Sequence, residues 1–135
     1  MTPNRVHHTG VVVRSLEEAY AFYRDKLGLR LVKEEMIQDQ GVKAALLDLG
    51  NGLLELLEPV QPDTGIARYL ERRGEGLHHV CLEVDDIRAS LADLKSKGVE
   101  LIDEEPRKGL TGTIAFLHPN ALNGVLVELV EAGSG

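Results

Sequence analysis

The sequence is poor in cysteine and in basic residues. Its single cysteine, Cys81, cannot form a disulfide within the chain, which is typical of a protein from a reducing compartment. The 15 Lys and Arg residues are outnumbered by 22 Asp and Glu residues, for a net charge of −7. Because binding to bulk nucleic acid needs a basic face, this balance argues against a nucleic-acid partner.

Long apolar runs are missing as well. No stretch approaches the roughly 20 apolar residues of a membrane span, and residues 1–5 contain no apolar signal-peptide core. We therefore expect no membrane partner and a cytoplasmic location. With 43% hydrophobic and 27% charged residues, the composition is that of a globular protein. The length predicts one domain over residues 1–135.

Two stretches of the chain resemble each other. Residues 6–15 and 77–86 are both apolar and rich in β-branched residues, and both carry a doubled histidine near the start. Each stretch predicts a buried strand that leads into a helix, because Ser15 with Glu18, and then Asp85 or Asp86, have the residue types of helix N-caps. A segment that occurs twice indicates two copies of one module that share one site.

Hydrophobic periodicity predicts the same element order in both halves: a strand, a helix and three more strands. This order predicts an α+β fold of two tandem βαβββ modules, module one at about residues 5–60 and module two at about 76–131. A short helix is expected at 66–73 and a loose tail at 132–135. The expected strands cover residues 5–13, 29–37, 42–49 and 53–58, and then 77–84, 99–102, 113–117 and 125–130.

The last expected strand of each module holds a glutamate among apolar residues. Glu55 and Glu128 follow His8 and His79 at almost the same spacing, so each module supplies one histidine and one glutamate. A buried carboxylate costs several kcal/mol unless it is paired or binds a metal. Imidazole and carboxylate ligands suit Zn, Ni, Co, Mn or Fe, whereas a closed structural zinc site prefers thiolates.

Each of these signals has a simpler explanation when it is taken alone. A strand histidine is more often a core or edge residue than a ligand, and a glutamate in a strand can face solvent. Both faces of residues 53–57 are apolar, however, and Glu128 shares its face with Leu126 and Val130. Agreement between the two modules makes a shared metal site the better interpretation.

With this set of residues the chain resembles the vicinal-oxygen-chelate superfamily, and within it the methylmalonyl-CoA epimerase family. The similarity covers essentially the whole chain. It lies in the Gly-Glu-Gly-Leu-His-His run that ends at His79, in Gln40-Gly41-Val42, and in residues 55–59, 103–109, 116–119 and 124–129.

The resemblance implies a cupped, incomplete eight-stranded barrel around one divalent metal ion (Co, Mn, Ni or Zn), held by His8, Glu55, His79 and Glu128. The implied reaction interconverts (2R)- and (2S)-methylmalonyl-CoA by proton transfer at the α-carbon, through a metal-stabilised enediolate. Glu128 and Glu55 are the candidate catalytic groups, beside a metal-bound water. A homodimer is also implied, as is an acyl-CoA partner.

The chain departs from the family at two positions. Some epimerases carry a glutamate, proposed as a proton-transfer base, where this chain has Ala44. The family motif His-Pro-Lys is replaced by a sequence that ends in Asn120. The second proton-transfer group is therefore unassigned.

Other polar residues have candidate roles of lower specificity. His118, Arg107 and Lys108 are candidate substrate-binding residues, the two bases as partners of CoA phosphates. Cys81 is expected to fill space in the core. The remaining expectations are that His7 and His78 face the helix side or solvent, and that Glu58 and Glu131 are surface charges.

Three alternative functions remain open. Glyoxalase I (lactoylglutathione lyase) uses the same kind of four-ligand set. A ring-cleaving dioxygenase would use two histidines and one carboxylate on iron, and the fourth ligand, Glu55, argues against it. A metal-free binding module of this fold is disfavoured by the intact ligand set.

Overall fold

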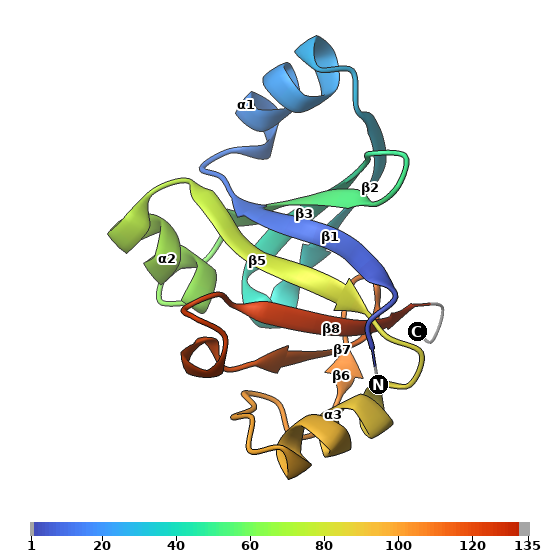
Figure 1. Ribbon diagram of the computed structural model, residues 1–135. Coiled ribbons are helices and arrows are strands. Elements are labelled where there is room, and N and C mark those ends of the chain that lie inside the picture. The colour runs from blue at the N-terminus through green and yellow to red at the C-terminus, as the bar shows by residue number, and fades with distance from the viewer. Residues whose placement is uncertain (1, 133–135) are drawn as a thin grey trace. The chain divides into compact units, whose positions relative to one another are not determined.

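The computed structural model describes residues 2–132, which form two compact units (Figure 1). One unit is His8–His78, and the other combines the residues up to His7 with those from His79 onward. The elements, in chain order, are β1 (Arg5–Val12), α1 (Leu16–Tyr20), η1 (Ala21–Lys26), β2 (Arg30–Ile37), η2 (Gln38–Gln40), β3 (Val42–Asp48), β4 (Leu53–Pro59), α2 (Gly65–Arg73), β5 (Gly76–Glu83), α3 (Ile87–Ser96), β6 (Arg107–Lys108), β7 (Gly112–Leu117), η3 (Pro119–Ala121) and β8 (Val127–Ala132).

The first unit pairs its strands in the order β2-β3-β4-β1. The β1–β4 pair is parallel and the other two pairs are antiparallel. One face of this sheet packs against α1, where Leu16 and Tyr20 meet Ala45, Leu47 and Leu56. Because side chains alternate along a strand, Glu55 lies on the opposite face from its neighbour Leu56.

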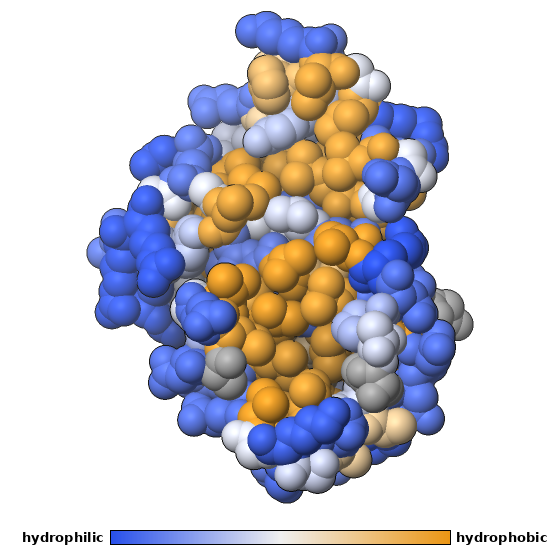
Figure 2. Space-filling model, in the orientation of Figure 1, coloured by the Kyte–Doolittle hydropathy of each residue, from blue (hydrophilic) through white to orange (hydrophobic). Residues whose placement is uncertain are grey.

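The second unit repeats this arrangement with the order β5-β8-β7-β6. The β5–β8 pair is parallel and the other two pairs are antiparallel. On the helix side, Ile87 and Leu91 of α3 pack against Ala115, Leu117 and Leu129. Figure 2 shows apolar residues over the part of this unit that contains β7 and β8. Each module thus has the predicted βαβββ order, and its helix covers one face of its sheet.

Glutamates of the last strands help to start both helices, so the expectation that Glu58 and Glu131 are plain surface charges is wrong. The Leu16 N–H donates to Glu58 Oε1 at 2.7 Å, and the Ile87 N–H donates to Glu131 Oε1 at 3.1 Å. These N–H groups have no partner within their own helix, and an anion there also interacts favourably with the helix dipole.

The predicted N-caps are present as well. The Ser15 hydroxyl accepts from the Glu18 N–H at 3.2 Å, and Asp86, of the two aspartates considered, accepts from the Ala89 N–H at 3.0 Å. Each module therefore begins its helix with one cap from the preceding residue and one from its own last strand. The helix after Ser15 continues beyond α1 as the π-helical turn η1.

The strand expected at 99–102 is absent. That stretch makes one isolated bridge, between Leu101 and Leu117, while the edge strand β6 lies between the expected strands 99–102 and 113–117, where no strand was predicted. A tight turn joins β6 to β7. The Gly109 N–H donates to the Gly112 carbonyl at 2.8 Å, and a Cβ on Gly109 would lie 2.8 Å from Ile114 Cδ1. This approach favours glycine there, because any larger residue would have to displace the Ile114 side chain.

Of the expected tail, Ala132 ends β8, and residues 133–135 lie outside the described residues. Among residues 2–132, no helix is long and apolar enough to cross a membrane.

Candidate metal centre

The first module holds one buried histidine–glutamate pair. His8 Nε2 lies 3.5 Å from Glu55 Oε1, and the two residues are 2% and 7% exposed. The strand register produces this contact. Gly10 is the partner of Glu55 in the parallel β1–β4 pair, and His8, two residues earlier in β1, shares its face.

The second module holds the matching pair. His79 Nε2 lies 3.3 Å from Glu128 Oε1, and the residues are 7% and 5% exposed. Here Cys81 is the partner of Glu128, and His79 precedes Cys81 by two residues in β5. The predicted histidine and glutamate of each module are therefore brought together, and on the sheet face opposite the helix.

The surroundings of both pairs are apolar. Leu46 is the cross-strand partner of Glu55, and Leu57 lies two residues beyond it on the same face. In the second module, Ile114 and Val130 are buried on the face of Glu128. A carboxylate in such surroundings is costly unless a positive charge compensates it. The imidazole nitrogen and the carboxylate of each pair are donor types that fit a divalent transition metal.

Ala44 lies on the same face as Glu55, because its cross-strand partner is Leu57. It is fully buried. The side chain at this position is a methyl group, so it offers neither a ligand nor a base.

An aromatic side chain beside the second pair was missed by the sequence analysis. The ring centroids of Phe116 and His79 are 5.8 Å apart, with the rings nearly perpendicular at 85°. Phe116 is also the cross-strand partner of Glu128. The apolar run of residues 113–117 predicted a strand but carries no local signal for this contact.

The candidate substrate-binding residues lie at the second module's β6 edge and in its β7–β8 connection. Arg107 and Lys108 are exposed on β6. His118 precedes η3, where its Nδ1 accepts from the Asn120 N–H at 3.1 Å and its Nε2 lies 3.3 Å from a carboxylate oxygen of Glu100. These contacts make His118 a helix-capping residue, and leave its substrate role a prediction.

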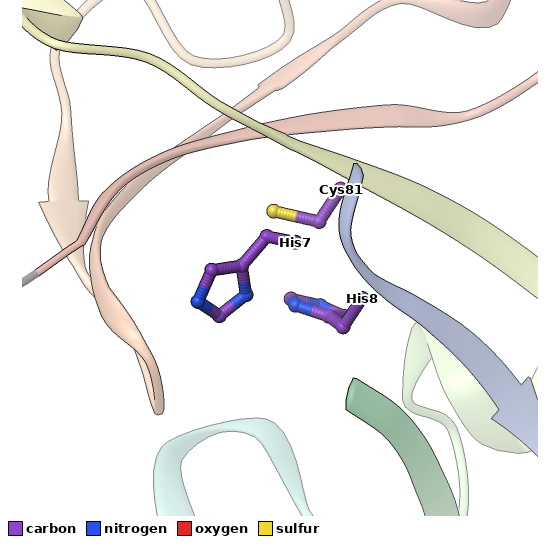
Figure 3. Close-up of side chains that lie close together, drawn as sticks. All are labelled: His7, His8 and Cys81. Carbon is purple, nitrogen blue, oxygen red and sulfur yellow. The ribbon is translucent and has the colours of Figure 1, made fainter. Parts of the chain in front are cut away.

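Three further residues were assigned minor roles. Figure 3 shows His7 on β1 and Cys81 on β5. His7 is 6% exposed, and one of its ring nitrogens lies within 4.8 Å of Cys81 Sγ on the face opposite the helix, so the expectation that it faces the helix side or solvent is wrong. Cys81 is fully buried and packs with Ile114 and Val130, as expected of core filling. His78 contacts the Tyr69 ring edge-on at a centroid distance of 5.0 Å.

A groove of about 490 Å³ lies elsewhere in the first unit. Its lining includes none of the predicted site residues. It is formed by Arg14, Pro59, Val60, Gln61, Pro62, Ala67, Leu70 and Glu71.

The Glyoxalase/Bleomycin resistance protein/Dioxygenase superfamily matches the chain over residues 7–116. The chain therefore belongs to this superfamily, as its resemblance to the vicinal-oxygen chelates predicted. Its relatives within the superfamily include methylmalonyl-CoA epimerases. An ethylmalonyl-CoA/methylmalonyl-CoA epimerase of Cereibacter sphaeroides is 39% identical over 94% of this chain and 97% of its own length.

Solved structures give the same relationship. Methylmalonyl-CoA epimerase from Mycobacterium tuberculosis superposes with a TM-score of 0.92 at 36% identity, over 97% of this chain and 89% of that one. A methylmalonyl-CoA epimerase in complex with methylmalonyl-CoA and NH4+ gives 0.91 at 37% identity, over 98% and 96% of the two chains. These matches confirm the predicted fold class.

Proposed function

We propose that the protein is a metal-dependent methylmalonyl-CoA epimerase, which interconverts the (2R) and (2S) forms of its substrate. The observation that carries the proposal is the buried histidine–glutamate contact that occurs once in each module, at 3.5 and 3.3 Å. Similarity at 36–39% identity to epimerases over nearly the whole chain supports the choice of substrate.

One divalent ion would be held by His8, Glu55, His79 and Glu128, each of which is buried. When bound, such an ion supplies a Lewis acid for the oxygens of a 1,3-dicarbonyl substrate. Cobalt, manganese, nickel and zinc all fit a mixed nitrogen and oxygen donor set, so the identity of the metal stays open within this group.

The chain's own residues would move the proton. A carboxylate beside the α-carbon removes its proton, and the electron pair of the broken C–H bond delocalises into the adjacent carbonyl groups. Return of a proton to the opposite face of the planar carbon inverts the configuration. Glu128 and Glu55 are the candidate carboxylates, because Ala44 supplies no base on the face of the first pair.

The apolar surroundings of both pairs suit this chemistry. Both carboxylates are buried, and charge interactions there are stronger than in water. Arg107 and Lys108, exposed on β6, are the proposed contacts for the CoA phosphates, and His118 is a further candidate for contact with substrate.

The test is incubation with each methylmalonyl-CoA epimer in deuterated water, with the metal-free protein and after loading with each of the four metals. We expect interconversion and deuterium at the α-carbon only in loaded samples. Methylglyoxal with glutathione is the parallel substrate. Formation of lactoylglutathione without epimerisation would replace the proposal by glyoxalase I.

Metal content gives a second test. We expect about one divalent ion per chain in the wild type and its loss in His79→Ala, with His118→Ala as a histidine control outside the two pairs. Equal metal content in the wild type and His79→Ala would contradict the ligand assignment.

The homodimer and the cytoplasmic location stay predictions. Light scattering tests the first, since a mass of 14.8 kDa at micromolar concentration would identify a monomer.

A further inference from the structure

Phe116 touches the second histidine–glutamate pair from its own strand. Its ring lies 5.8 Å from the His79 ring in an edge-to-face arrangement, and its backbone is in register with Glu128. Edge-to-face contacts are favourable only over a limited range of ring orientations. The contact therefore restrains the imidazole, whose terminal torsion angle is otherwise broad.

The ring of Phe116 is itself held in place. The Arg107 guanidinium carbon lies over it, 5.6 Å from the centroid. Asp103 links the two residues, since its carboxylate accepts from the Phe116 N–H at 2.9 Å and faces Arg107 Nε at 3.4 Å. A continuous series of contacts thus runs from Asp103 through Arg107 and Phe116 to His79.

The first module differs at the corresponding place. The cross-strand partner of Glu55 is Leu46, an aliphatic residue that is 5% exposed. The two modules repeat the histidine and the glutamate, but an aromatic partner in register with the glutamate is found only beside the second pair. The first pair, which has Leu46 at this place, therefore serves as an internal control for the effect of the Phe116 ring on the second pair.

We propose that Phe116 is a positioning residue that fixes the ring orientation of His79, and that Arg107 acts on His79 through Phe116. Ligand and catalytic groups must be held within about 0.5 Å and 10–20° of their working geometry, which needs support from neighbouring side chains. The contact geometry of the second module stands by itself, and its importance for catalysis rests on the proposed function.

The first experiment needs neither metal nor substrate. The ring protons and carbons of the histidines are followed by NMR in the metal-free protein, with Phe116→Leu copying the residue of the first module. We expect one narrow His79 signal in the wild type, and a broadened or doubled one in Phe116→Leu, because the ring samples more than one orientation. The His8 signal is expected to be unchanged. A narrow His79 signal in Phe116→Leu would overturn the proposal, whatever the activity of the variant.

Two further substitutions guard against a general loss of structure. Phe116→Tyr keeps the aromatic ring and is expected to keep the narrow signal. Should Phe116→Leu fail to fold, Phe116→Met replaces it, with the same expected broadening. A narrow signal with methionine, or a broad one with tyrosine, would each contradict a role for the ring.

Arg107 is tested against its neighbour on the same strand. Arg107→Ala is expected to broaden the His79 signal and Lys108→Ala to leave it narrow, because it is the Arg107 guanidinium that lies over the Phe116 ring. If Arg107 acts through Phe116, the double variant Arg107→Ala/Phe116→Leu adds nothing to Phe116→Leu alone. Additive broadening would show that Arg107 reaches His79 by another route.

Cobalt binding and kinetics connect the positioning role to function. Phe116→Leu is expected to weaken cobalt binding about tenfold and to shift the visible spectrum of bound cobalt. It is expected to lower kcat more than it changes KM. Unchanged cobalt affinity, spectrum and kcat would refute a role for the positioning contact in the site. Failure of the wild type to epimerise methylmalonyl-CoA would instead refute the proposed function, and the NMR result on His79 would stand.

Discussion

Glu128→Gln separates the energetic and the chemical roles of the buried carboxylate. Glu128 is 5% exposed, and its Oε1 lies 3.3 Å from the imidazole nitrogen Nε2 of His79. An amide of the same shape keeps the packing and carries no charge, so Glu128→Gln removes the cost of burying a carboxylate in the metal-free protein. We expect metal-free Glu128→Gln to be about 1.5 kcal/mol more stable than the wild type.

Bound metal should remove most of the stability that Glu128→Gln gains over the wild type. Free metal at 100 times the Kd stabilises the folded wild type by about 2.7 kcal/mol. If the amide weakens binding about tenfold, the same metal concentration stabilises the variant by about 1.4 kcal/mol. The difference in unfolding free energy should therefore shrink from about 1.5 to about 0.2 kcal/mol. Turnover should fall by about 10²-fold or more if Glu128 transfers the proton.

Urea unfolding at pH 8, with and without cobalt, measures both free energies. Glu17→Gln, on the exposed side of α1, is the matched control and should change neither value by more than about 0.5 kcal/mol. A metal-free Glu128→Gln that is about 3 kcal/mol less stable than the wild type would refute the reasoning. Such a loss would mean that the negative charge of Glu128 stabilises the fold as part of an ion pair, and that its role is not to bind a metal.

Three further predictions concern stability and reactivity. Glu131→Gln weakens the bond from the Ile87 N–H and should cost about 1 kcal/mol in thermal unfolding, and no change in Tm would contradict its role at the start of α3. Tyr20→Phe removes a 2.5 Å hydrogen bond to Glu34 and should cost about 1–2 kcal/mol at pH 7. Burial, and then the bond to Glu34, raise the pKa of Tyr20, so this stability is present below about pH 10 and is lost as pH rises further. The difference between Tyr20→Phe and the wild type should therefore shrink in alkaline unfolding experiments, and a constant difference would contradict the assigned cause. Cys81 is fully buried, so a thiol reagent should label it only as fast as the structure opens, and faster in urea. Immediate labelling of the native protein would contradict the burial of Cys81 in β5.

The sequence predicted most of the strands and both histidine–glutamate pairs. Alternation and turn residues define β1, β3, β4 and β5 to within a few residues. The pairs were predictable because the chain repeats them. His8 and Glu55 have weak signals individually, but His79 and Glu128 recur at the same places in the second module.

Features that depend on contacts between distant residues were missed. The strand β6 is two residues long and is defined by its pairing with β7, so the local hydrophobic pattern does not predict it. The stretch 99–102 has strand-forming residues but makes only one bridge, at Leu101. The cap from Glu58 and the ring contact of Phe116 also join residues far apart in the chain, as do most side-chain contacts that define a site.

The spacing of the two glutamates in β4 has a consequence for how this chain tolerates insertions and deletions. Glu55 and Glu58 are three residues apart and so face opposite sides of the sheet: one toward His8, the other toward the start of α1. Loss of a single residue between them would put both carboxylates on the same side, so one of the two contacts would have to break. The same holds for Glu128 and Glu131 in β8. Insertions and deletions should therefore accumulate in the turns around these strands. The three-residue spacing between the two glutamates of each strand should be kept even where the sequences of the two modules have diverged.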